Sequence, residues 1–292
     1  MKMNKIELKQ AIMSTAAVTG FSPILIEKDY QCSIILKKIY ENEFLTRHCI
    51  FKGGTLLAKC YLPFFRMSED LDFSVINEIC HDRKDRRKLA DEIRNLIPTI
   101  LSEFGFYEIV PLKGFNESRQ YNAVFVYPSF FLPHEKIKFE LGFRGDLLLP
   151  PERQLLQTLV RHPYQPEKSL MPVFEALVLS ESEAYAEKVR AALTRTIPAI
   201  RDFYDIFAIK KRGFDLLDKS FIDLVRMKIS FDNKAGISLK ELKKSELKAR
   251  IPTELDGVLK IGAKFSLEES WKILESIVDQ GKLSSELELV SK

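Results

Sequence analysis

The sequence is poor in the residues that build disulfide frameworks and zinc sites. Its 292 residues include only four cysteines and four histidines. The cysteines lie in apolar or mixed stretches, and no two of them form a Cys-x-x-Cys pair. We therefore expect neither a zinc site nor a set of disulfide bonds, and we predict reduced thiols of the cytosolic kind.

Long apolar runs are also missing. The first residues, 1–7, form no apolar signal segment, and the longest uncharged stretch, residues 121–134, contains two prolines. A membrane-spanning helix needs about 20 consecutive apolar residues. We therefore expect a cytoplasmic protein that does not act in a membrane.

Neither sign of charge dominates the composition. The chain has 45 Lys and Arg against 41 Asp and Glu, a net charge of +4, and 46% of its residues are hydrophobic. The small positive net charge excludes a strongly basic nucleic-acid tail but is compatible with an acidic partner such as RNA. The balance is typical of a globular protein with one large or two modest domains.

Apolar periodicity divides the chain into two halves. The first half predicts helices at residues 5–17, 23–40, 55–62 and 81–104, and strands at 49–51, 71–75, 107–111, 123–127 and 136–143. After residue 150 the strand signals fade, and helices are predicted at 174–194, 200–211, 215–229, 239–250 and 267–280. We predict an α+β fold: a mixed-sheet domain at 1–150 with two leading helices, and an α-helical domain at 151–292.

Two short motifs in the first half suggest phosphate and metal chemistry. Gly53 and Gly54 lie between a short strand and a helix, where main-chain N–H groups can approach a phosphate, and Thr55 can cap the helix or donate its hydroxyl. On the next strand, Asp70 and Asp72 point to one face and can hold Mg²⁺. There are simpler alternatives: the glycine pair can be an ordinary tight turn, and the two aspartates can lie on a solvated strand face without a ligand.

A third carboxylate lies on the strand predicted at 136–143. Lys138 and Glu140 share one face of that strand, while its apolar residues share the other. Glu140 can therefore serve as a metal ligand or a base, although an exposed face of an amphipathic strand is the simpler explanation.

The helical half carries its own charged cluster. Lys188 and Arg195 lie on one helix face with small residues, which admits a triphosphate, and Asp202 and Asp205 follow on the next helix. The alternative for the face with Lys188 is an exposed charged stripe, and the alternative for Asp202 and Asp205 is a structural salt bridge. Between residues 201 and 250 there are 13 Lys and Arg against eight Asp and Glu, which favours a polyanionic acceptor over a drug.

Taken together, these residues resemble the nucleotidyltransferase family of AbiEii/AbiGii toxins, the toxin halves of phage abortive-infection toxin–antitoxin pairs. Five blocks carry the resemblance, in order and over nearly the whole chain: Lys52-Gly-Gly-Thr with Leu57, Arg66-Met-Ser-Glu-Asp-Leu-Asp-Phe, Lys138-Phe-Glu, Ala186-Glu-Lys and Arg201-Asp-Phe-Tyr-Asp. The resemblance implies a polymerase-β-like nucleotidyltransferase domain followed by a helical domain, with the active site in the cleft between them.

The resemblance also implies an activity and its partners. A nucleotide would pass from an NTP to an acceptor, with tRNA a plausible one, in an antiviral defence system whose antitoxin is a DNA-binding regulator. The alternatives are a nucleotidyltransferase acting on a small, antibiotic-type molecule and a non-catalytic scaffold that binds a nucleotide or a partner.

Carried onto this chain, the resemblance assigns roles to the candidate residues. Phosphate or nucleotide binding falls to Gly53, Gly54, Thr55, Lys138 and Lys188; Mg²⁺ binding to Asp70, Asp72 and Glu140; and catalysis to Asp70, Asp72, Glu140, Lys188 and Asp205. Asp205 would organise the site or deprotonate the acceptor. Many nucleotidyltransferases have Gly-Ser at the turn where this chain has Gly-Gly-Thr, so the hydroxyl of Thr55 is displaced by one position.

Overall fold

The chain folds into two compact units, Met1–Leu179 and Ser180–Lys292. The computed structural model describes residues 4–76, 82–143, 147–231, 239, 241–281 and 283. Among these residues, no helix is both long enough and apolar enough to cross a membrane. Each unit is described by itself.

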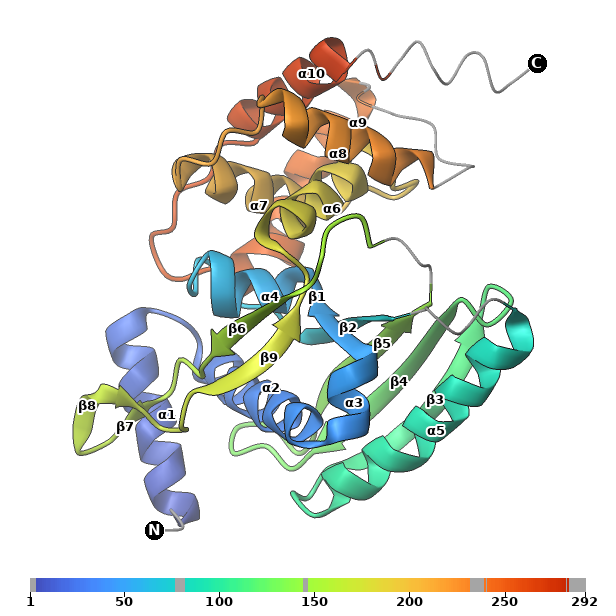
Figure 1. The fold of residues 1–292 in the computed structure, drawn as a ribbon. Helices are drawn as coiled ribbons and strands as arrows, with labels where there is room; N and C mark the ends of the chain where they lie inside the picture. The colour runs from blue at the N-terminus through green and yellow to red at the C-terminus, as the bar shows by residue number, and fades with distance from the viewer. Residues whose placement is uncertain are drawn as a thin grey trace. The chain divides into compact units, whose positions relative to one another are not determined.

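A mixed sheet forms the centre of the first unit (Figure 1). Its seven strands are β1 (Cys49–Lys52), β2 (Asp70–Val75), β3 (Tyr107–Phe115), β4 (Gln120–Tyr127), β5 (Glu135–Gly142), β6 (Glu152–Leu156) and β9 (Phe174–Val178), in the spatial order β3-β4-β5-β2-β1-β9-β6. The pairs β2–β5 and β1–β9 are parallel, and the other neighbours are antiparallel. The mixed sheet expected from the sequence is confirmed.

Five α-helices, a π-helix (Leu57–Tyr61) and a small ribbon accompany this sheet in the described residues. The α-helices are α1 (Lys5–Thr19), α2 (Pro23–Glu41), α3 (Glu43–His48), α4 (Gly53–Leu56) and α5 (Arg83–Ser102), and the ribbon consists of β7 (Arg161–His162) and β8 (Gln165–Ser169). Asn4 and Glu7 form a capping box that starts α1, and Gly20, at φ 77°, ends it. Pro23 starts α2, where its missing N–H costs nothing.

The two faces of the central strands differ in burial. Leu71 and Phe73 of β2 are fully buried, and the Phe73 ring lies 5.6 Å from Phe51 and 5.0 Å from Phe139, centroid to centroid, on the neighbouring strands. The helices α2 and α5 pack against each other and against the sheet. The alternate residues of β2 are half-buried, so this strand presents its aspartates on the more open face.

The described elements of the second unit are all helical. The principal helices are α6 (Glu181–Thr194), α7 (Ile200–Lys211), α8 (Lys219–Ser230), α9 (Glu241–Arg250) and α10 (Leu267–Gly281). The rings of Phe203 and Trp271 stack at 5.9 Å, and the Ser270 hydroxyl donates to the Phe203 carbonyl at 2.8 Å, which joins α7 to α10. The predicted helical half is therefore found in these residues.

The structure corrects the prediction for residues 151–178. Residues 174–178 are the buried strand β9 and not the start of a helix, and β6, β7 and β8 precede it. As a result the first unit extends to Leu179, beyond the predicted boundary at residue 150. The error arose because β9 is short and continues into the apolar periodicity of α6, where a strand and a helix give the same signal.

Smaller differences occur elsewhere. The helix α3 was not predicted, and the helix expected at 55–62 begins at Gly53 and continues from Leu57 to Tyr61 as a π-helix. The helix expected at 81–104 is α5, and its predicted first residue, like Cys80, lies outside the described residues. Cys32 and Cys49 are free thiols, and burial raises the pKa of each to about 12, so both stay protonated.

Candidate active site

A glycine turn at the end of β1 meets a carboxylate of β2. Gly53 has φ +80°, a conformation that favours glycine, and Lys52 before it pairs with Asp72 across the two strands. A Cβ atom on Gly53 would collide with Oδ2 of Asp72. The lack of a side chain therefore lets the main chain of the turn lie directly against this carboxylate.

The second glycine makes room for two polar side chains. A Cβ atom on Gly54 would lie 2.7 Å from Nη2 of Arg66 and 2.9 Å from Oγ of Ser68. Arg66 is almost fully buried, and its Nη1 donates to the Met67 carbonyl at 2.9 Å. The turn is thus bordered by a carboxylate at one glycine and by a guanidinium and a hydroxyl at the next.

The two aspartates share their strand face with residues of β5. In the parallel pairing of β2 with β5, Asp70 lies opposite Lys138 and Asp72 opposite Glu140. Glu140 accepts a hydrogen bond of 2.9 Å from Nε2 of Gln120 on β4. Three carboxylates and one lysine therefore occupy adjacent positions on two strands.

Thr55 faces inward. Its hydroxyl donates to the main-chain carbonyl of Asp70 at 2.5 Å, and the residue is 2% exposed. This bond ties α4 to the first residue of β2. The hydroxyl therefore fixes the position of Asp70 relative to the glycine turn.

The oxygen donors at this site suit Mg²⁺. Within the described ranges, no three His, Cys, Asp or Glu side chains form a group that could hold a metal ion by themselves. Mg²⁺ commonly takes one or two carboxylates and completes its shell with substrate phosphates and water. Asp70 and Asp72, half-exposed and next to the bare turn at Gly53, fit that pattern.

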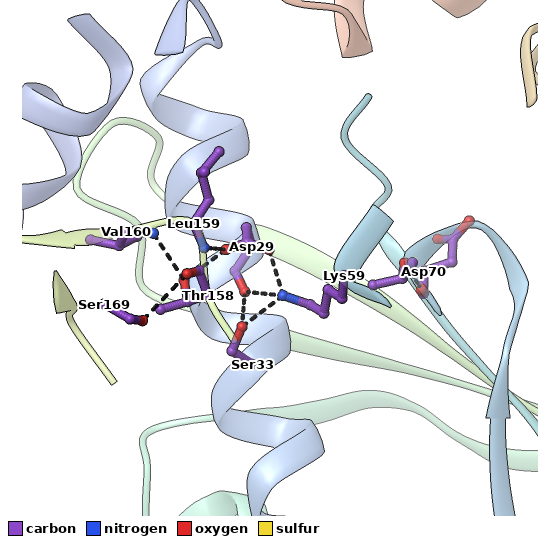
Figure 2. A network of polar contacts seen from close by, with 9 residues as sticks. Asp29, Ser33, Lys59, Asp70, Thr158, Leu159, Val160 and Ser169 are labelled. Carbon is purple, nitrogen blue, oxygen red and sulfur yellow. Dashed lines mark hydrogen bonds and ion pairs between the residues drawn. The ribbon is translucent and has the colours of Figure 1, made fainter. Parts of the chain in front are cut away.

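A buried ionic network holds the helix that follows the turn (Figure 2). Nζ of Lys59, in the π-helix, lies 2.5 Å from Oδ1 of Asp29 and donates to Oγ of Ser33 at 2.7 Å. Oδ2 of Asp29 accepts bonds of 2.7 Å from the Thr158 hydroxyl and from the main-chain N–H of Leu159. Asp29 on α2 thereby connects the π-helix to the segment after β6.

The two residues before Asp29 are also buried charges. Lys28 pairs with Glu69 at 2.8 Å, directly before β2, and with Glu135 at 2.6 Å, at the start of β5. Burial alone would lower the pKa of Lys28, but hydrogen bonds to these two glutamates outweigh burial and raise it. Glu27 accepts from Ser129 and from the Phe130 N–H, so three consecutive residues of α2 secure the segments around the site.

In the second unit the predicted phosphate-binding lysine is ion-paired. Nζ of Lys188 lies 2.9 Å from Oδ2 of Asp205 and 3.3 Å from Oδ1 of Asp202, and its side chain is 13% exposed. Arg195 reaches the other oxygen of Asp202 at 3.3 Å. The structure therefore brings Lys188 and Asp205 together as one ionic cluster of α6 and α7.

A second buried ion pair lies nearby on α6. Nζ of Lys228, from α8, lies 2.5 Å from Glu183 and 3.1 Å from Glu187. The side chains of Lys228 and Glu183 are 3% and 0% exposed. This pair joins α6 to α8 and has no counterpart among the sequence predictions.

Sequence reasoning missed several residues that shape the turn. Arg66 and Ser68 belong to a quoted motif but received no role, although their spacing with Asp70 and Asp72 is alternate, as on one face of an extended chain. That alternation could have identified them. No local pattern marks the contact between Asp29 and Lys59, because the two residues belong to separate segments.

Comparison with known proteins gives two results. The family model described as "Nucleotidyl transferase AbiEii toxin, Type IV TA system" matches residues 34–268. The nucleotidyltransferase toxin MenT4 from Mycobacterium tuberculosis H37Rv has a similar structure, with a TM-score of 0.57 at 18% sequence identity, covering 94% of this chain and 98% of MenT4. The comparison with curated proteins gave no match.

Proposed function

The chain belongs to the AbiEii family of nucleotidyltransferase toxins of type IV toxin–antitoxin systems, and from this premise we propose that it transfers a nucleotide from an NTP to an RNA acceptor with the help of Mg²⁺. The observation that supports this most is the turn at Gly53, whose main chain lies against the Asp72 carboxylate with no room for a side chain. A triphosphate held at that turn lies beside the metal-binding carboxylate.

The glycine turn is the proposed triphosphate site. Residues 53–61 form a continuous helical segment, so the N–H groups at its start have no helical partner and suit an anion. Arg66 next to Gly54 adds positive charge, and Ser68 adds a hydroxyl donor. Lys138, exposed and opposite Asp70, offers a further cation for phosphate.

Asp70 and Asp72 are the proposed metal ligands. Mg²⁺ bound there would neutralise charge on the attacking and leaving oxygens during transfer to the α-phosphorus. Glu140 is opposite Asp72 and is held by Gln120, which suits a base for the acceptor hydroxyl. The third metal ligand expected there has no support in the described residues, where no three such side chains group around a metal position. Thr55 keeps Asp70 in place through its main chain and makes no proposed contact with phosphate.

Lys188 is the proposed phosphate ligand of the second unit. Its ion pairs with Asp202 and Asp205 orient the ammonium group. Asp205 is fully buried beneath it, so we assign Asp205 a positioning role. A phosphate would replace one aspartate as the partner of Lys188.

The biological setting follows the family. We propose that the transfer inhibits growth in the cytoplasm during phage infection, that tRNA is the acceptor, and that a DNA-binding antitoxin counteracts the toxin.

The test is incubation of the purified protein with Mg²⁺, total cellular RNA and each labelled NTP in turn. We expect one NTP to label RNA, and Asp72→Asn to abolish labelling without changing the melting temperature. Labelling by Asp72→Asn at the wild-type rate would contradict the proposed metal site. Binding of NTP without transfer to RNA would contradict the RNA acceptor and favour a small-molecule acceptor or a non-catalytic scaffold.

A further inference from the structure

The first two turns of α5 carry the densest cationic stretch in the chain. Five of the six residues 83–88 are Arg or Lys, with Asp85 the exception, and no other six-residue stretch of the sequence holds as many. Arg83, Lys84, Arg87 and Lys88 are all exposed. The buried residues of α5 lie further along the helix, at Ala90, Ile93, Ile97 and Leu101.

These cations do not stabilise the helix that carries them. Lys84, Arg87 and Lys88 lie three and four residues apart, so like charges are neighbours on one face. They also lie near the N-terminal end of the helix, where the helix dipole disfavours positive charge. The exposed Arg47 of α3 pairs with Glu43 four residues away. Arg87 and Lys88 also have acidic residues at such spacings, Asp91 and Glu92, but in the described part of the chain they form no ion pair with them.

The same four side chains lack an acidic partner on other elements. Over the described part of the chain, no ion pair involves Arg83, Lys84, Arg87 or Lys88, whereas Arg94 further along α5 pairs with Asp91. Their positive charge is therefore available to a polyanion in solution.

This cationic surface continues onto the turn between β3 and β4. Nη2 of Arg86 donates to the main-chain carbonyl of Glu117 at 3.3 Å, and Figure 1 shows the start of α5 beside that turn. Arg119 in the turn is exposed, and so is Phe115 directly before it, with 45% of its surface accessible. An exposed aromatic ring beside cations suits a nucleic acid, because bases stack on such rings while phosphates meet the cations.

The turn lies close to the proposed active site along the sheet. Gln120, the first residue of β4, bonds Glu140, and it pairs with Gly142, which is opposite Ser74. Ser74 is two residues beyond Asp72, a distance of about 7 Å along a strand. An acceptor bound at the active-site face can thus extend over this turn to α5.

We propose that the start of α5 and the β3–β4 turn bind the phosphate backbone of the RNA acceptor. This inference rests on the proposed function for the identity of the acceptor, and it assigns the RNA a binding surface outside the residues that hold the nucleotide. The surface acts through charge and stacking, so it contributes affinity for RNA and no base specificity.

The test compares two variants that each lose three positive charges. The first is Lys84→Gln/Arg87→Gln/Lys88→Gln, which keeps good helix formers on α5. The control is Lys260→Gln/Lys264→Gln/Lys272→Gln, at exposed lysines of the second unit. Binding of a fluorescein-labelled RNA hairpin with a single-stranded 3′ end is followed by anisotropy between about 50 and 200 mM salt.

We expect the α5 variant to bind RNA at least about tenfold more weakly and to lower the log–log salt slope by about 2, as the loss of three contacts with single-stranded phosphates predicts. In transfer assays its KM for RNA should rise while the KM for NTP stays at the wild-type value. The control should bind like the wild type, and both variants should melt like it.

Equal weakening in both variants, or none in the α5 variant, would overturn the proposal. So would equally tight binding of poly-glutamate with the same dependence on α5, because the surface would then fit an acidic protein. RNA that binds through α5 but is labelled with no NTP would contradict the proposed function while leaving the RNA-binding surface in place.

Discussion

The two units hold their charged residues in different ways. In the first unit, Asp70 and Asp72 are half-exposed on an open strand face, and the main chain of a glycine turn lies directly against Asp72. In the second unit, Lys188, Asp202 and Asp205 pair with each other in a largely buried cluster. The aspartates of the first arrangement are accessible to solvent, whereas the charges of the second are largely buried and paired with each other.

This difference shows what a charged motif alone leaves undecided. Burial of a charge costs free energy unless it is paired, so a buried cluster such as that of Lys188 holds the fold together even when it also binds a ligand. A half-exposed carboxylate contributes little to the free energy of unfolding. Substitutions in the first unit should therefore change activity most, and those in the second should change stability as well.

The largest effect is expected at the glycine turn. Gly53→Ala should reduce transfer about a thousandfold, because the new Cβ displaces the Asp72 carboxylate and disturbs the turn. Gly105→Ala is the matched control: Gly105 has φ +81° but no atom within 4 Å of a Cβ. Both variants carry the same backbone strain, so a similar loss of activity in the two would attribute the effect to strain alone. The measurement is the transfer rate at saturating NTP.

The next effect concerns the buried network of Figure 2. Lys59→Met should lower the free energy of unfolding by about 4 kcal/mol, because Asp29 would be left buried without its cation. Adding Asp29→Asn should recover part of that loss, and urea unfolding of the single and double variants measures the coupling. If the losses of unfolding free energy in Lys59→Met and Asp29→Asn simply add in the double variant, the ion pair does not stabilise the π-helix and the prediction is wrong.

Two lysines of the second unit sharpen the comparison further. Lys228→Met should cost about 3 kcal/mol of unfolding free energy, since Glu183 stays buried, and should leave the KM for NTP unchanged. Lys188→Met should also destabilise the protein and, in addition, raise the KM for NTP at least about tenfold. Thermal unfolding and initial rates give both quantities. An unchanged KM in Lys188→Met would show that its cluster is structural only.

The smallest effect is a pH dependence of stability at Glu27. Burial raises the pKa of Glu27 above 4.5, and hydrogen bonds from Ser129 and Phe130 offset only part of that shift. The folded state therefore binds the proton more tightly than the unfolded state, so stability falls as pH rises from 4.5 through the raised pKa. Glu27→Gln should remove this component, which is about 1.4 kcal/mol for each tenfold difference in proton affinity between the folded and unfolded states. Urea unfolding at several pH values in this range gives the unfolding free energy of the wild type and of Glu27→Gln. The same pH dependence in both proteins would refute the prediction.

The parts of the fold that depend on local pattern were predictable. The helices α2 and α7 and the alternating strand β2 carry clear periodicities. The alternation of β2 marks both aspartates, and the Gly-Gly pair itself marks the turn. The strand β9 was missed because five residues next to a helix give no distinct period.

The parts that depend on pairing between distant segments were not predictable. The pairing of Asp72 with Glu140 and the contact of Gly54 with Arg66 require the strand order, which no single segment encodes. Likewise the sequence cannot tell that Lys188 is held by two aspartates of α7, or that Glu27, Lys28 and Asp29 face inward. In each case the missing information is which segments become neighbours.

The central claim is that Asp72 and the glycine turn bind an NTP together with Mg²⁺. Calorimetric titration of a non-hydrolysable NTP analogue, with and without Mg²⁺, tests it most directly for the wild type, Asp72→Asn and the control Asp91→Asn, an exposed aspartate of α5. We predict that Mg²⁺ tightens binding at least about tenfold in the wild type and in Asp91→Asn but not in Asp72→Asn. The same Mg²⁺-dependent gain in Asp72→Asn would contradict the account.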